Sequence, residues 1–136
     1  MIAKENLPRV IYEQMNDVHE EEVELLNHLE RILEENVLDI AKVDSVLEEM
    51  LVHTQEHFSN EEKLMKEVGF PAFIMHQGEH LRVLNEMKRV VSHWQMQRDT
   101  DVIRDYFLGT LIEWLMLHIN TMDTITAQFI AMRKGC

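Results

Sequence analysis

One stretch of the sequence decides how the chain is expected to fold: residues 57–65 read His57-Phe58-Ser59-Asn60-Glu61-Glu62-Lys63-Leu64-Met65. Its His57 and Glu61 stand four positions apart. Such positions differ by only about 40° around an α-helix, so both side chains would face the same side. His76 and His80 repeat this spacing further along the chain. The two pairs predict two neighbouring helices that hold a metal ion between them.

The apolar residues on either side of these pairs recur every three or four positions, which indicates four helices. Asp44 or Ser45 is expected to cap the second helix, and Gly69 to end it. Pro71 suits the first turn of the third helix, and the Arg98-Asp99-Thr100-Asp101 cluster suits the cap of the fourth. The predicted helices cover residues 16–37, 44–67, 71–97 and about 100–132, after an N-terminal arm of residues 1–15.

The composition agrees with an all-helical chain of one domain, residues 1–136. Only 4 glycines and 2 prolines interrupt 136 residues, which leaves few sharp turns. Four helices with short connections predict an all-α, antiparallel up-down-up-down four-helix bundle.

Net charge and cysteine content narrow the function. The formal charge of -12 opposes binding to nucleic acid and to anionic membranes. No signal-peptide pattern and no apolar run of roughly 18 residues occurs, so we expect a cytoplasmic protein without membrane insertion. The acidic run Glu20 to Glu24 is interpreted as a solvated helix face. Cys136 is the only cysteine, so a metal ion would need histidine and carboxylate ligands.

Candidate metal ligands occur on all four predicted helices. Each motif alone is weak, because a chain this rich in His and Glu is expected to contain about one such pair by chance. Five imidazoles and two carboxylates together suit two bridged metal ions better than one zinc ion, which needs three or four ligands. His28 and His93 lack a partner motif and are interpreted as ordinary histidines. The candidates are His19, His57, Glu61, His76, His80, His118 and Asp123.

The sequence resembles the hemerythrin family over about residues 16–130. Residues 57–65 are similar to the family's HF..EE..M pattern, and residues 76–80 read HQGEH. Residues 114–123 read WLMLHINTMD, which is similar to WL..HI...D. Asn27 also stands eight residues after His19, as it does in the family.

This resemblance implies a centre of two iron ions that binds dioxygen. His76, His80 and His118 would bind one iron, and His19 and His57 the other. Glu61 and Asp123 would bridge the pair, and dioxygen would occupy the open position of the iron with two imidazoles. The resemblance implies an oxygen pocket formed by Phe58, Trp114, Leu115 and Ile119.

The expected function is reversible oxygen binding for carriage, storage or delivery, without enzymatic turnover beyond weak peroxidase-type activity. The ligand set supports a carrier, because neutral imidazoles in place of carboxylates disfavour the high-valent iron that cleaves dioxygen. Two alternatives stay open: an enzyme that reduces peroxide or nitric oxide at the same centre, and an oxygen sensor. Dioxygen is the expected partner, and a monomer is expected, with an oligomer left open.

Three features depart from a simple match to this pattern. His118 and Asp123 are five residues apart, which separates them by about 140° on a regular helix. A local π-type widening would bring both to one side. Asn16 stands where relatives often carry Asp, and His53 where they often carry an aromatic residue, so hydrogen bonds behind the ligands are expected to differ. The usual aromatic-rich arm is replaced by residues 2–10, which leaves its docking open.

Overall fold

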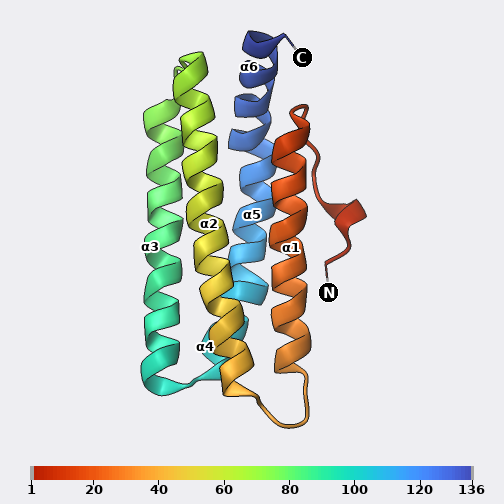
Figure 1. The fold of residues 1–136 in the computed structure, drawn as a ribbon, viewed down its shortest axis with the longest axis vertical. Coiled ribbons are helices and arrows are strands. Elements are labelled where there is room, and N and C mark those ends of the chain that lie inside the picture. Colours follow the sequence, from red (N-terminus) through yellow and green to blue (C-terminus); the bar gives the residue numbers. More distant parts are fainter. Residues whose placement is uncertain (1, 136) are drawn as a thin grey trace.

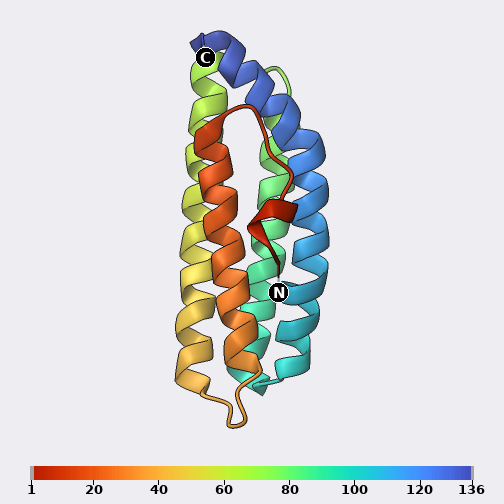
Figure 2. The same cartoon turned by 90° about the vertical axis from the view of Figure 1, so that its right-hand side faces the viewer.

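The protein is a four-helix bundle in which neighbouring helices run in opposite directions (Figures 1 and 2). A computed structural model describes residues 2–135, so Cys136 lies outside the described residues. The predicted all-α up-down-up-down architecture is confirmed, and no strand occurs in residues 2–135. No helix among these residues has the length and hydropathy of a membrane span.

Three long helices and one composite helix form the bundle. A short 3₁₀ turn, η1 (Lys4–Asn6), lies in the N-terminal arm. The first three helices are α1 (Glu13–Leu33), α2 (Ile40–Val68) and α3 (Phe73–Gln97). The fourth consists of α4 (Thr100–Asp105), the π-helical segment η2 (Tyr106–Thr110), α5 (Leu111–His118), the π-helical segment η3 (Ile119–Asp123) and α6 (Thr124–Lys134).

The start of α2 differs from the prediction. Asp39, not Asp44 or Ser45, caps this helix, and its carboxylate accepts a hydrogen bond from the Lys42 backbone N–H at 3.2 Å. α1 ends at Leu33 and not near residue 37. Residues 34–39 form the connection between α1 and α2. The Asp44 carboxylate instead accepts hydrogen bonds across the bundle from Trp94 Nε1 at 2.7 Å and from the Arg98 guanidinium at 2.6 Å.

Capping residues and turn hydrogen bonds determine where the next helices end and begin. Gly69 ends α2 in the left-handed conformation, at a φ of 67°, which a residue without Cβ adopts at no steric cost. Pro71 lies in the turn that follows, and α3 begins two residues later than predicted, because the Phe73 N–H still bonds back to the Phe70 carbonyl at 3.2 Å. Asp99 caps α4, as the sequence predicts.

The apolar core falls into two clusters with a polar region between them. On α2 the first cluster ends at Phe58, and the second includes Leu64 and Val68. His57 and Glu61 therefore lie where the two clusters meet. Rigid apolar packing on both sides holds these polar side chains in place.

The N-terminal arm is docked on the bundle by two asparagines of α1. The Asn16 amide accepts a hydrogen bond from the Val10 N–H at 2.9 Å and donates one to the Val10 carbonyl at 2.8 Å. Asn27 makes the same pair of bonds with the Ile2 backbone, at 2.9 and 2.8 Å. An aspartate at position 16 would lack the donor, so the amide at this position serves the arm directly.

Candidate metal centre

Seven buried polar side chains meet inside the bundle, and they are the seven candidates that the sequence singles out. One comes from α1, two from α2, two from α3 and two from the composite fourth helix. Their exposed fractions run from 0% for Asp123 to 6% for His57. Ligand atoms lie within 4.8 Å of one another in two groups that share Glu61. The larger group comprises Glu61, His76, His80, His118 and Asp123, and the smaller comprises His19, His57 and Glu61.

Glu61 divides its two oxygens between the two groups. Its Oε1 lies 2.8 Å from His76 Nε2 and 3.3 Å from His80 Nε2. Its Oε2 lies 3.2 Å from His57 Nε2. The carboxylate therefore stands between the three-histidine group and the two-histidine group.

Asp123 repeats this arrangement from the opposite side of the bundle. Its Oδ1 lies 3.1 Å from His118 Nε2 and 3.2 Å from His76 Nε2, both in the three-histidine group. Its Oδ2 lies 3.0 Å from His19 Nε2. Two carboxylates, each with one oxygen toward each group, form a geometry suited to bridging two cations.

The π-helical segment η3 brings His118 and Asp123 to the same side. It spans Ile119–Asp123, so the helix is widened over the five residues where regular geometry would separate the two side chains. The Oδ1 to Nε2 distance of 3.1 Å is the result. The local widening that the sequence requires is present.

Several polar atoms in the cluster lack a well-directed hydrogen bond. Glu61 Oε1, Asp123 Oδ1 and His80 Nε2 are buried and unsatisfied in this sense, although ring nitrogens lie close to both oxygens. His76 Nε2 and His118 Nε2 also face each other at 3.0 Å, and both cannot carry a proton there. Buried polar atoms without partners cost free energy, and a cation coordinated by them removes that cost. The donor set fits a metal site.

The pKa values show how the charges of the metal-free cluster are balanced. Burial acts to raise the pKa of Glu61, but hydrogen bonds from His57, His76 and His80 hold it well below its usual value. Burial acts to lower the pKa of His57, yet hydrogen bonds to Glu22 and Glu61 raise it well above the ordinary range. The pKa of His76 rises to about 9 despite burial, mainly through Asp123 and Glu61. Protons on these histidines thus balance the ionised carboxylates.

The comparisons with known proteins agree with this geometry. The family described as "Hemerythrin HHE cation binding domain" matches residues 10–130. This chain belongs to the hemerythrin family. Its cluster of histidine and carboxylate side chains accordingly fits the cation site that the family description names.

Curated relatives support the same assignment. A bacteriohemerythrin of Aquifex aeolicus (strain VF5) is 35% identical over 114 residues, which cover 84% of this chain and 86% of the relative. A bacteriohemerythrin of Stenotrophomonas maltophilia (strain R551-3) is 30% identical over 105 residues, covering 77% of this chain and 65% of that protein. A third, from Ralstonia nicotianae, is 28% identical over 102 residues.

Three side chains of this hemerythrin domain lie behind the imidazoles and were not predicted as site residues. Glu22 Oε2 lies 3.1 Å from His57 Nδ1, and Glu62 Oε2 lies 2.9 Å from His80 Nδ1. Thr126 Oγ1 lies 2.8 Å from His76 Nδ1. Such partners fix the orientation of a ligating imidazole and increase its basicity.

The interpretation of Glu20 to Glu24 as a solvated face is wrong for Glu22, which is 2% exposed. Glu22 follows His19 by three residues, so it shares a helix face with a candidate ligand, and that spacing was the available signal. Burial acts to raise the pKa of Glu22, but the hydrogen bond to His57 keeps it lowered. The Glu22 carboxylate is therefore held ionised beside the ring.

The other histidines of this hemerythrin domain lie outside the cluster. His53 pairs with the exposed Glu21 at 3.3 Å, and its ring centroid is 6.3 Å from that of His57. His28 and His93 are exposed, in agreement with their interpretation as ordinary histidines.

The predicted pocket residues lie at two places around the cluster. The Phe58 ring stacks on His80 with 3.9 Å between centroids, and the Trp114 ring stacks on His118 at 4.4 Å. Both aromatic residues therefore cover the three-histidine group. Leu115 and Ile119 are buried in the second apolar cluster with Met15.

Proposed function

We propose that this protein binds dioxygen reversibly at a centre of two iron ions, for oxygen carriage, storage or delivery and without enzymatic turnover. One observation carries the proposal. Glu61 and Asp123 each direct one oxygen toward two imidazoles of the three-histidine group and the other oxygen toward one imidazole of the two-histidine group. A single metal ion would not need two carboxylates that span two groups of imidazoles.

Each side chain has a proposed role in holding the iron pair. His76, His80 and His118 bind one iron, and His19 and His57 bind the other. Glu61 and Asp123 bridge the two. The iron with two imidazoles keeps the open position for dioxygen, because it has one ligand fewer from the protein.

The surrounding residues favour binding and release over reaction. When bound, the two iron ions would supply the electrons that dioxygen takes up on binding and returns on release. The proposed apolar surroundings of the centre consist of Phe58 and Trp114 over the three-histidine group and of Leu115 and Ile119 in the second apolar cluster, and all except the half-buried Trp114 are buried. They exclude water, which would otherwise promote irreversible oxidation of the centre.

The first experiment measures metal content and reversibility together. Protein purified with iron is assayed for iron per chain, reduced anaerobically with dithionite, and examined by visible spectroscopy before and after oxygen is added. We expect two iron ions per chain and a new absorption band that fades under argon. The band should return through repeated cycles.

Two results would contradict the proposal. A single zinc ion per chain would indicate a structural metal site. Irreversible bleaching on first contact with oxygen would exclude a carrier, and steady consumption of peroxide above that of free iron would favour the enzymatic alternative.

A further inference from the structure

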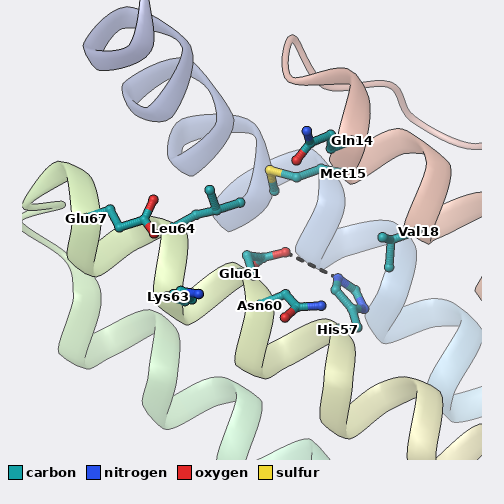
Figure 3. A pocket seen from close by; sticks show the side chains of 9 residues that line it. All are labelled: Gln14, Met15, Val18, His57, Asn60, Glu61, Lys63, Leu64 and Glu67. Carbon is teal, nitrogen blue, oxygen red and sulfur yellow. Dashed lines mark hydrogen bonds and ion pairs between the residues drawn. The ribbon is translucent and has the colours of Figure 1, made fainter.

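A hollow of about 310 Å³ opens between α1 and α2 beside the two-histidine group (Figure 3). Its lining changes from exposed to buried with depth. Gln14, Asn60, Lys63 and Glu67 at its rim are exposed, Val18 and Leu64 are half-buried, and Met15, His57 and Glu61 are buried. The hollow therefore leads from solvent to two of the candidate metal ligands.

Apolar side chains from both helices line this hollow: Met15 and Val18 from α1, and Leu64 from α2. Met15 from α1 and Leu64 from α2 extend toward each other near Glu61 (Figure 3). Val18 of α1 lies near His57 in the same hollow (Figure 3). A molecule that passes between these side chains arrives at the two-histidine group and not at the three-histidine group.

The three-histidine group is covered on its own side. Phe58 and Trp114 stack on two of its imidazoles, as described above. A second, smaller hollow of about 110 Å³ lies between α3 and the fourth helix and touches His76, with Met75 in its wall. This hollow is the competing route to the centre.

The charges around the larger hollow favour uncharged molecules. Its rim carries one cation, Lys63, and one anion, Glu67, and its buried ionisable groups are the paired Glu61 and His57. The whole chain has a formal charge of -12, which repels anions at a distance. The apolar side chains of Met15, Val18 and Leu64 disfavour hydrated ions, because an ion would lose solvation beside them.

We propose that the hollow between α1 and α2 is the route by which small uncharged molecules reach the two-histidine half of the centre. Leu64 and Met15 set its width. This inference rests on the proposed function, because dioxygen is the molecule that would use the route. The route is the path from solvent to the centre, and it is distinct from the place where bound dioxygen would remain.

The test narrows each route in turn. Leu64→Trp fills the larger hollow, and the matched control Met75→Trp fills the smaller one. Stopped-flow measurement of oxygen binding and release should show both rates reduced roughly tenfold or more in Leu64→Trp, because a rate falls exponentially with an added barrier. The equilibrium affinity should change much less. Met75→Trp should leave both rates unchanged.

Val18→Phe narrows the hollow from the opposite wall and serves if Leu64→Trp does not fold. Unchanged oxygen rates in the folded variants would overturn the route. Slower rates in Met75→Trp alone would assign access to the hollow beside His76 and would equally overturn it.

A second readout separates the route from oxygen chemistry. Xenon binds apolar cavities, so methyl NMR of zinc-loaded protein under xenon pressure should show shifts at Val18. These shifts should persist in Met75→Trp and disappear in Leu64→Trp. Xenon shifts without reversible oxygen binding would mean that the route exists and the proposed function fails. Oxygen binding without xenon shifts at Val18 would overturn the route alone.

Discussion

The Glu22 carboxylate of α1 lies 3.1 Å from His57 Nδ1 of α2, and both side chains are almost fully buried. This contact joins two helices through a candidate ligand. It places the His57 Nδ1–H toward Glu22 and leaves Nε2 free to face Glu61. The orientation of the imidazole is thereby fixed before any metal ion binds.

Replacing Glu22 should weaken metal binding without unfolding the bundle. Glu22→Gln keeps the size of the side chain but removes its charge, and we expect iron affinity to fall roughly 10- to 100-fold. Competition with a chelator of known affinity measures the change. Glu21→Gln is the matched control, because Glu21 is exposed and pairs with His53, which lies outside the cluster. Equal losses in the two variants would mean that general charge, not the contact with His57, is responsible.

Removing one histidine of the two-histidine group should abolish metal binding in that group and leave binding in the three-histidine group intact. His19→Ala deletes one of the two imidazoles in the smaller group and leaves His76, His80 and His118 in place. We expect about one tightly bound metal ion per chain in place of two, since the smaller group then has a single imidazole. Metal analysis after gel filtration checks this count, with the exposed His93→Ala as control. Two retained ions in His19→Ala would exclude the proposed division of ligands.

The arm should depend on the Asn16 amide. Asn16→Ala leaves the buried Val10 N–H and carbonyl without their partners, so the free energy of unfolding should fall by about 1–3 kcal/mol. Urea unfolding of the loaded protein measures this. The exposed Asn85→Ala should be nearly neutral. Asn16→Asp should destabilise as well, because a carboxylate cannot donate to the Val10 carbonyl, and full stability of Asn16→Asp would refute this account.

The metal-free protein should become less stable as pH rises from neutral. The pKa of His76 is raised from 6.5 to about 9, so its contribution is complete below pH 6.5 and is lost as pH rises through 9. The pKa of Glu61 is lowered from 4.5, so its contribution is present above pH 4.5 and is lost only in stronger acid. Stability should therefore be highest between about pH 4.5 and 6.5.

Metal loading should reverse this trend, because bound iron replaces the protons and binds more tightly as the histidines lose them. Thermal unfolding of both forms across this pH range provides the comparison. His76→Gln should flatten the slope of the metal-free form. A metal-free protein with the same stability at pH 6.5 and pH 9 would contradict the assignment.

Sequence spacing predicted the features that depend on one helix at a time. The four-residue spacing of His57 and Glu61 defined a shared helix face, and the five-residue spacing of His118 and Asp123 required a widened turn that is present in η3. The first follows from helix geometry alone, whereas the second also needs the family resemblance, on which the assignment of Asp123 rests. The metal roles of these residues stay predictions.

The partners that lie behind the candidate ligands depend on contacts between helices and were not predicted. Glu22 was assigned to a solvated face and Glu62 received no role, because their partners His57 and His80 lie on other helices and the rotation of each helix is set by packing. The same reason explains Asp44, whose carboxylate serves Trp94 and not a helix cap. A local pattern does not contain these pairings.

The contact between His19 and Asp123 joins residues 104 positions apart. During synthesis, the ribosome would release His19 long before Asp123. A partial chain that stops after α3 would already carry five of the seven candidate ligands but lack both from the fourth helix. Coordination of a metal ion by the complete set of seven candidate ligands must therefore follow translation of residue 123.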